Sequence, residues 1–163
     1  MKENTIYEER LTARWMIGTF GLLALAFLIL IVFQLSRGPL GLNPAPTWLF
    51  LLMFLLFCGL GFNFRRLVVR ITGTGVGVSY GLVRRTVPFS SIADCYSSRA
   101  HLIKYGGWGV RLWRGKTGWK LVYSVVGAPL VVLNLKGGRV RELLFSTMNK
   151  DRVIEIVKKR ITP

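Results

Sequence analysis

Two long stretches without a charged residue constrain this chain more than any other feature. They are residues 15–35, which number 21, and residues 47–64, which number 18. At about 1.5 Å rise per residue, helices of these lengths extend roughly 31 Å and 27 Å, close to the hydrocarbon thickness of a bilayer. We therefore expect a hairpin of two transmembrane helices, with Trp15 and Trp48 as anchors at the membrane interface.

A cleaved signal peptide and a buried soluble helix are the alternatives for the first stretch. The stretch is longer than a usual signal-peptide core, begins after fourteen polar-rich residues and lacks a clear small-x-small cleavage site. The residues after position 64 are too few to enclose two such helices. Residues 36–46, with the sequence SRGPLGLNPAP, contain the glycines and prolines of a short turn between the spans.

The distribution of basic residues predicts the orientation of the hairpin. The N-terminal segment 1–14 carries Lys2, Arg10 and Arg14, whereas the loop 36–46 carries only Arg37. Three arginines, at positions 65, 66 and 70, follow the second span at once. The positive-inside rule therefore places both termini in the cytoplasm and the loop 36–46 outside it.

Residues 65–163 form a basic region that we expect to be one cytoplasmic domain. The whole chain has 23 Lys and Arg against 7 Asp and Glu, and this region holds 19 of the bases and 4 of the acids. Short Val- and Ile-rich runs between glycine turns predict seven or eight antiparallel strands, as in a sandwich or barrel. The spacing of Val153, Val157 and Ile161 predicts a closing helix over about 148–161.

The order of strands and closing helix resembles the pleckstrin-homology (PH) fold. The motif Tyr105-Gly106-Gly107-Trp108-Gly109-Val110-Arg111 and the later Lys136-Gly137-Gly138-Arg139 resemble bacterial membrane proteins that have two N-terminal spans and a PH-like domain. The resemblance covers nearly the whole chain. It implies a fold class of a two-helix transmembrane hairpin followed by a mainly antiparallel PH-like barrel closed by a C-terminal helix, in the inner (cytoplasmic) membrane. It implies no biochemical activity.

No set of side chains in the sequence supports a named reaction, so we expect no enzyme, no cofactor and no metal site. Gly73-Thr74-Gly75-Val76-Gly77 does not have the spacing of a dinucleotide-binding loop, and a β-turn explains it better. His101 has no evident catalytic partner. Cys58 lies in an apolar span, and Cys95 lies in an expected strand as a small buried side chain.

The basic residues are the candidate functional residues, because cations near a bilayer attract anionic headgroups. Cations and aromatic residues alternate over residues 104–123, as at a headgroup layer, although the tryptophans there could instead pack the barrel. The residues that we expect to contact headgroups are Arg65, Arg66, Arg70, Arg84, Arg85, Arg114, Lys116 and Lys120.

Two functions are consistent with this sequence. The first is a non-enzymatic membrane protein that docks a basic domain on anionic lipid headgroups. The second is an accessory or assembly subunit of a larger membrane complex or homo-oligomer, which binds partners through the spans and the domain. Binding of nucleic acid is a weaker alternative, since charge alone gives no specificity and no recognition motif is present.

Overall fold

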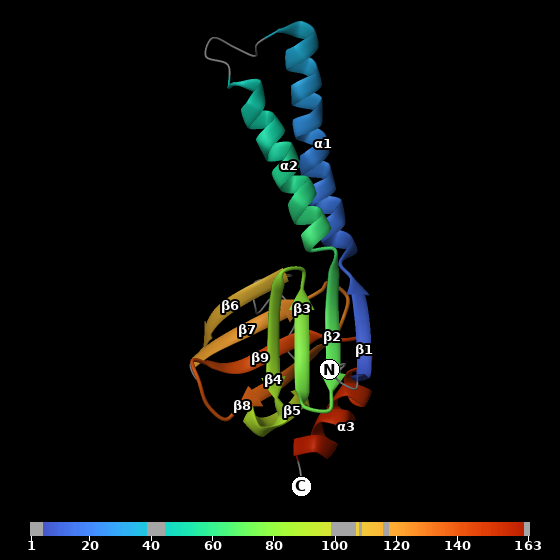
Figure 1. Ribbon diagram of the computed structural model, residues 1–163, viewed down its shortest axis with the longest axis vertical. Helices are drawn as coiled ribbons and strands as arrows, with labels where there is room; N and C mark the ends of the chain where they lie inside the picture. The colour runs from blue at the N-terminus through green and yellow to red at the C-terminus, as the bar shows by residue number, and fades with distance from the viewer. Residues whose placement is uncertain (1–4, 39–44, 99–106, 108, 116–117, 162–163) are drawn as a thin grey trace. The chain divides into compact units, whose positions relative to one another are not determined.

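The computed structural model of the chain describes residues 5–38, 45–98, 107, 109–115 and 118–161. Its contacts divide the chain into a helical unit, Ala13–Arg65, and a β unit that combines Met1–Thr12 with Arg66–Pro163. Figure 1 shows the elements of both units. The β unit is thus assembled from chain on both sides of the helices.

The helical unit contains α1 (Arg14–Arg37) and α2 (Thr47–Asn63), which pack against each other in opposite directions. Phe27 contacts Phe57 and Phe50, with ring centroids 5.6 Å and 6.3 Å apart. A Cβ at Gly61 would lie 3.3 Å from the Cβ of Phe20, so the glycine allows the helices to approach closely. The backbone N–H of Ala13 donates to the carbonyl of Arg65 at 2.8 Å and joins the two ends of the unit.

Most of the apolar surface of these helices stays exposed. Ala24 is the one buried residue of α1, and α2 has none. By length and composition α1 is able to cross a membrane, and it is the one such helix in the described part of the chain. Apolar residues all round a helix are typical of a membrane span or of the interior of a large protein.

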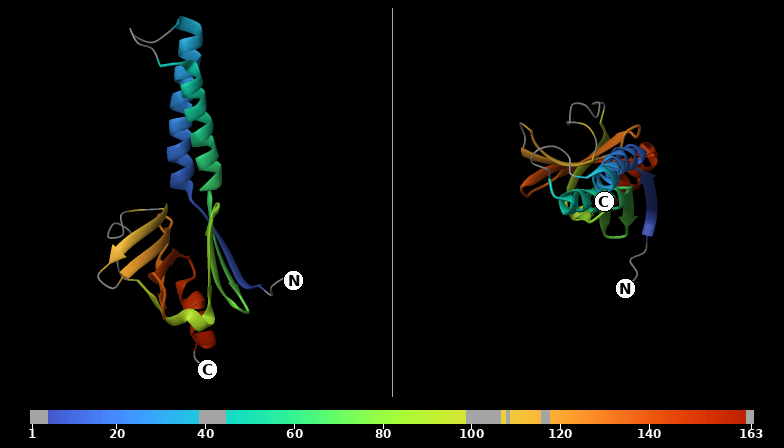
Figure 2. Two further views of the ribbon diagram at one scale, coloured as in Figure 1. Left: turned by 60° about the vertical axis from the view of Figure 1, so that its left-hand side comes forward. Right: turned by 90° about the horizontal axis from the view of Figure 1, so that it is seen from above.

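The β unit contains two sheets, which Figure 2 shows from two further sides. Sheet A has the order β1-β2-β3-β4 and is antiparallel throughout; its strands are β1 (Thr5–Thr12), β2 (Arg66–Thr72), β3 (Gly75–Tyr80) and β4 (Val83–Pro88). Sheet B has the order β5-β8-β9-β7-β6; its strands are β5 (Ile92–Ser97), β6 (Gly109–Gly115), β7 (Gly118–Ser124), β8 (Leu130–Leu135) and β9 (Val140–Ser146). The short helix η1 (Phe89–Ser91) carries the chain from one sheet to the other.

The core of the β unit is built from alternating residues of the strands. In β2, Leu67, Val69 and Ile71 are fully buried, while the residues between them are more accessible. Tyr123 and Phe145 contribute the largest fully buried rings of sheet B. The C-terminal helix α3 (Lys150–Ile161) packs on β5 and η1 and buries Val153 and Val157. The period-two alternation leaves the other face of sheet A to solvent.

Gly75 makes the closest backbone approach in sheet A. A Cβ there would lie 2.3 Å from the carbonyl oxygen of Val87, which no side chain permits. The Thr72 hydroxyl donates to the Gly75 carbonyl at 3.3 Å across the same turn. Residues 73–77 therefore form a hairpin turn and the start of β3, in agreement with the β-turn interpretation.

The expected fold class, a two-helix transmembrane hairpin followed by an antiparallel PH-like barrel, is wrong. A strand precedes the helices, because β1 pairs with β2 and makes the helical unit an insertion into sheet A. Helix α2 has 17 residues, about 26 Å, because it starts after Pro46 and ends at Asn63 before the chain turns into β2. It is shorter than the usual 20 residues of a span, which leaves α1 alone as a candidate.

The second sheet also differs from the expected antiparallel order. β7 and β9 pair in parallel, from Trp119 opposite Val140 to Tyr123 opposite Phe145, and β8 lies on the far side of β9. Parallel neighbours require a crossover, which here includes β8 itself. The strands of the described chain, in two sheets and with one parallel pair, therefore do not form the antiparallel PH-like barrel that the sequence suggested.

Candidate functional site

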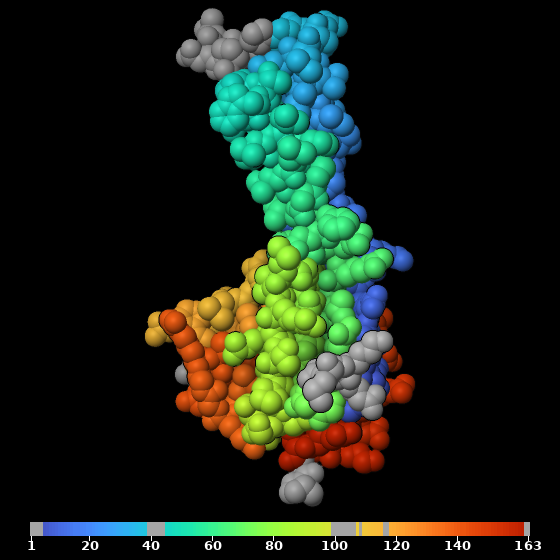
Figure 3. Space-filling view, in the orientation of Figure 1, coloured from blue at the N-terminus to red at the C-terminus, as the bar shows by residue number. Residues whose placement is uncertain are grey.

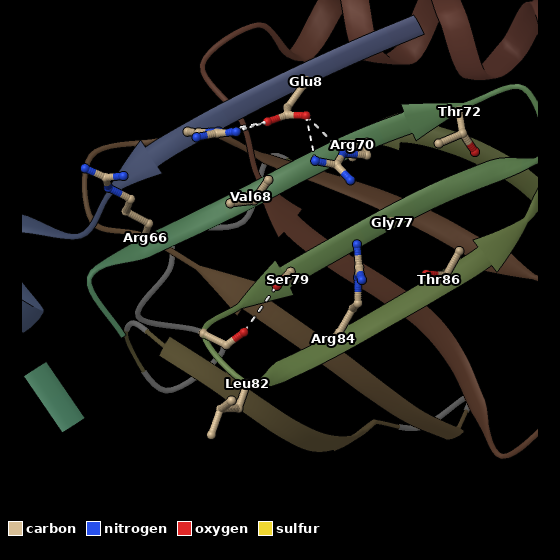
Figure 4. A pocket seen from close by; sticks show the side chains of 12 residues that line it. Glu8, Arg66, Val68, Arg70, Thr72, Gly77, Ser79, Leu82, Arg84 and Thr86 are labelled. Atoms are coloured by element: carbon tan, nitrogen blue, oxygen red, sulfur yellow. Dashed lines mark hydrogen bonds and ion pairs between the residues drawn. The ribbon is translucent and has the colours of Figure 1, made fainter. Parts of the chain in front are cut away.

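The solvent face of sheet A carries a depression of about 580 Å³, shown in Figure 4. All four strands of the sheet contribute to it. We call it the cationic groove, and its lining residues are Glu8, Arg10, Arg66, Val68, Arg70, Thr72, Gly77, Ser79, Gly81, Leu82, Arg84 and Thr86. Four arginines and one glutamate give this surface a net charge of +3.

Cross-strand pairing brings these distant residues together. One row of partners runs across the sheet through Glu8, Arg70, Gly77 and Thr86. The next row runs through Arg10, Val68, Ser79 and Arg84. Directly paired residues lie on the same face, so both rows face the groove.

The floor of the groove is low because β3 contributes small residues. Gly77 has no side chain and Ser79 has a short one, whereas arginines stand on the strands on either side. In Figure 4 the Arg84 side chain extends from β4 over β3 beside Gly77. Guanidinium groups thus border an open floor from two strands, a geometry that suits a phosphate or carboxylate.

Glu8 is the one carboxylate in the groove, and it pairs with two of the arginines. Its Oε1 lies 2.7 Å from Arg10, and its Oε2 lies 2.8 Å from Arg70. The hydrogen bonds from Arg10 and Arg70 lower the pKa of Glu8 below its ordinary value of 4.5. Among the described residues, no carboxylate pairs with Arg66 or Arg84, so each keeps its full charge, and Glu8 with its two arginines adds a net charge of +1.

The opposite face of β1 has a different role. Glu9 accepts hydrogen bonds from the Tyr7 hydroxyl at 2.7 Å, from the Met148 backbone N–H at 2.9 Å and from the Thr147 hydroxyl. Burial and the neighbouring Glu9 carboxylate raise the pKa of Tyr7. Glu9 thereby ties the first strand to the segment that leads into α3.

The predicted headgroup contacts do not gather in one place. Arg66, Arg70 and Arg84 line the groove, but Arg85 pairs with buried Val78 and so lies on the other face of β4, where its charge acts on Tyr123. Arg65 belongs to the helical unit and lies over the Phe62 ring, 4.1 Å from its centroid. Two further predicted contacts, Arg114 and Lys120, lie on the β6–β7 hairpin of sheet B.

On that hairpin the cations already have partners. Lys120 Nζ lies 2.6 Å from Glu142, and both side chains are mostly buried. The guanidinium carbons of Arg114 and Arg139 lie 5.9 Å and 6.0 Å from the centroid of the Trp119 ring, within the range of a cation–π contact. The ion pair neutralises Lys120, whereas the cation–π contacts orient the two arginines and leave their charges in place.

Several sequence-based candidates lie outside the described residues: His101, Tyr105, Gly106, Trp108 and Lys116. Of the predicted motif, the structure describes Gly107 and Gly109, both with positive φ, and Arg111 on β6. Trp15 and Trp48 lie at the starts of α1 and α2 and are about two-thirds exposed. The structure describes no cluster of metal ligands among the residues that it covers.

Cys95 is fully buried in β5, in agreement with its interpretation as a core residue. Burial raises the pKa of the Cys95 thiol to about 12, and the charge of Asp94 acts in the same direction. A thiol with so high a pKa is a poor nucleophile at neutral pH. Cys58, on α2, is exposed.

Arg10 and Glu8 are the functional residues that the sequence reasoning did not assign to a site. The signal was present in Thr5–Thr12, where Glu8 and Arg10 alternate with Tyr7, Glu9 and Leu11 as on a strand. No known family model, curated protein or solved structure matches the chain. The functional argument therefore depends on the chemistry of the groove.

Proposed function

We propose that this chain is a non-enzymatic membrane-anchored protein that docks the cationic groove of its β unit on anionic lipid headgroups. The observation that carries the proposal is the convergence of Arg10, Arg66, Arg70 and Arg84 on one depression that has a single carboxylate. A basic residue close to an anionic surface contributes about 1 kcal/mol of attraction.

The exposed helices support the membrane part of the proposal. An α1 of 24 residues that buries only Ala24 leaves a large apolar surface for which hydrocarbon is the favourable environment. Arg66 is the first residue of the β unit after α2, three positions beyond Asn63. The chain itself therefore keeps this cation near the helical anchor.

The test uses the full-length chain in two kinds of nanodisc. One contains phosphatidylcholine alone, and the other also contains about 30% of the anionic lipid phosphatidylglycerol. A donor fluorophore is placed on Gly73→Cys, in an exposed turn of sheet A with open space around it. Cys58→Ala removes the exposed thiol, and buried Cys95 does not react. Energy transfer to an acceptor-labelled lipid reports docking of the β unit.

We expect greater energy transfer in the anionic discs, reversed at about 0.5 M salt because the Debye length falls to roughly 4 Å. Arg66→Gln with Arg84→Gln should remove the difference between the lipids. The control variant is Arg114→Gln, which removes one charge beside Trp119, outside the groove. This variant should retain the difference in energy transfer between the two kinds of disc. Equal transfer in both discs, or an unchanged difference in the double variant, would contradict the proposal.

A notch on α1 favours the second function, an accessory subunit that binds a partner helix. Its lining residues are Arg14, Trp15, Gly18, Thr19 and Leu22, and it encloses about 380 Å³. At 100° per residue, Trp15, Gly18 and Leu22 lie opposite the face with Phe20 and Phe27, which contact α2. Gly18→Leu should fill the notch, and loss of a stoichiometric partner on purification in mild detergent would support this function.

A further inference from the structure

We infer that the tip of the β3–β4 hairpin inserts Leu82 into the bilayer beside the docked groove. This inference depends on the proposed docking and assigns that docking to a lipid surface, instead of to a free phosphate. Leu82 is 91% exposed, the highest exposure among the large apolar residues of the chain that the structure describes. Moving an exposed leucine side chain from water into an apolar environment is favourable.

The turn presents Leu82 in a defined way. Gly81 has a φ of 61°, a left-handed conformation that suits glycine, and it is followed directly by Leu82. The Ser79 hydroxyl donates to the carbonyl of Gly81 at 3.3 Å and holds the turn (Figure 4). Val83, the next residue, is 40% exposed, so the tip carries two adjacent apolar side chains.

The position of the tip within sheet A makes the bilayer the expected partner. Leu67 pairs with Tyr80, which pairs with Val83, so the tip lies at the end of the sheet where β2 begins. Thr12 pairs with Arg66 at that same end. Only Ala13 separates Thr12 from α1, so this end of the sheet is tied covalently to the proposed membrane anchor.

The chemistry of the neighbouring groove matches this partner. Leu82, Arg66 and Arg84 all line the groove, which places an apolar tip next to the two arginines without a carboxylate partner. Cations that bind phosphates next to an apolar side chain that enters the acyl region fit the layered chemistry of a bilayer. A soluble phosphate compound would use the arginines but would give the leucine no apolar environment.

Figure 3 shows the β3–β4 strands on the surface of the β unit, in yellow-green, with their solvent face uncovered by the described chain in this view.

The opposite end of the same sheet provides a matched control. Gly73 lies in the exposed β2–β3 turn, and a side chain there meets no atom within 4 Å. Gly73 is also exposed to solvent, but it has neither an apolar neighbour such as Val83 nor a link to α1.

The experiment uses the full-length chain in the Cys58→Ala background, in the phosphatidylcholine and phosphatidylglycerol nanodiscs described above. An environment-sensitive fluorophore is attached to Leu82→Cys or, as the control, to Gly73→Cys. We expect a blue shift, and quenching by a nitroxide on the upper acyl chain, for the probe at position 82 and not at position 73. In a separate variant, Leu82→Ser, the equilibrium constant for docking of the β unit on the anionic discs should fall at least about tenfold. The salt dependence of docking should stay unchanged.

The outcomes separate the two proposals. If the probe at position 82 behaves like the probe at 73 while energy transfer from position 73 still depends on phosphatidylglycerol and salt, the insertion of Leu82 is overturned and headgroup docking stands. If the lipid and salt dependence is absent as well, both proposals fail. If the probe at position 82 also inserts in neutral discs, and the Arg66→Gln, Arg84→Gln variant gives the same result, the docking function is overturned. Only an apolar contact between position 82 and the bilayer would then remain.

Discussion

The two sheets of the β unit both carry arginines and lysines, but these side chains have different partners on each sheet. On sheet A, Arg66 and Arg84 face an open groove and pair with no carboxylate among the described residues. On sheet B, Lys120 pairs with Glu142 and Arg114 lies beside Trp119. The comparison teaches that strand register, and not the number of cations, decides whether the cations of a sheet line one depression.

The largest effect should come from breaking the pair on sheet B. Glu142→Gln leaves Lys120 Nζ, in a side chain that is 19% exposed, without its charged partner. We expect a loss of about 1.5–3 kcal/mol in the free energy of unfolding. Urea unfolding of the full-length chain, followed by tryptophan fluorescence, measures it. Glu155→Gln, on the exposed side of α3, is the control, and equal losses in both variants would refute a structural role for the pair.

The second effect concerns the two neighbouring acids of β1, which lie on opposite faces. Glu9→Gln weakens the acceptor of the Met148 N–H and of the Thr147 and Tyr7 hydroxyls, so we expect a loss of about 1 kcal/mol in unfolding free energy. Glu8→Gln should change it little, because its ion pairs are on the surface. The same urea titration compares the two variants, and a greater loss for Glu8→Gln would reverse the assignment of the faces.

The third effect is on lipid docking. Glu8→Gln removes the one carboxylate of the groove and frees Arg10 and Arg70, so docking on the anionic discs should strengthen about fivefold. Glu9→Gln should leave it unchanged, because that carboxylate faces α3. Energy transfer from the Gly73 probe reports both. Weaker docking in Glu8→Gln would mean that the glutamate holds the arginines in their binding positions.

The smallest effect is a pH dependence. The pKa of Glu8 is lower in the folded chain than its ordinary value of 4.5, so its ion pairs stabilise the fold above that pH. The stabilisation is lost as the pH falls below 4.5 and through the folded pKa. The difference in unfolding free energy between the native chain and Glu8→Gln should therefore vanish at low pH. A difference that grows on acidification would contradict the lowered pKa.

The sequence predicted local features better than it predicted pairing. The uncharged run from Trp15 to Leu35 predicted the position of α1 in the sequence to within two residues at each end. The spacing of Val153 and Val157 did the same for α3. β1 was missed, because eight residues with three consecutive charged side chains give only a weak strand pattern until a partner strand is known. The parallel pairing of β7 with β9 has no local signature, since strand order depends on packing between distant runs.

The groove shows the same limit. Arg70 and Arg84 were proposed as headgroup contacts from charge alone, but their sequence separation says nothing about a shared face. Only the register of β2, β3 and β4 places them on either side of Gly77 and Ser79. The same register places Arg84 and Arg85 on opposite faces of β4, although the sequence analysis expected both to contact headgroups. Charge therefore suggested the proposed class of ligand, and strand register determines which arginines share the groove.

The insertion of the helices between β1 and β2 has a consequence for the order in which the chain acquires its structure. β1 leaves the ribosome before the helices, yet its partner begins at Arg66, after the whole helical segment. When α1 and α2 pair, Ala13 and Arg65, at the two ends of the helical unit, come together and form a hydrogen bond. The entropic cost of closing this loop is therefore met before the strands β1 and β2 pair. Pairing of the two helices thus prepares the pairing of β1 with β2 in sheet A.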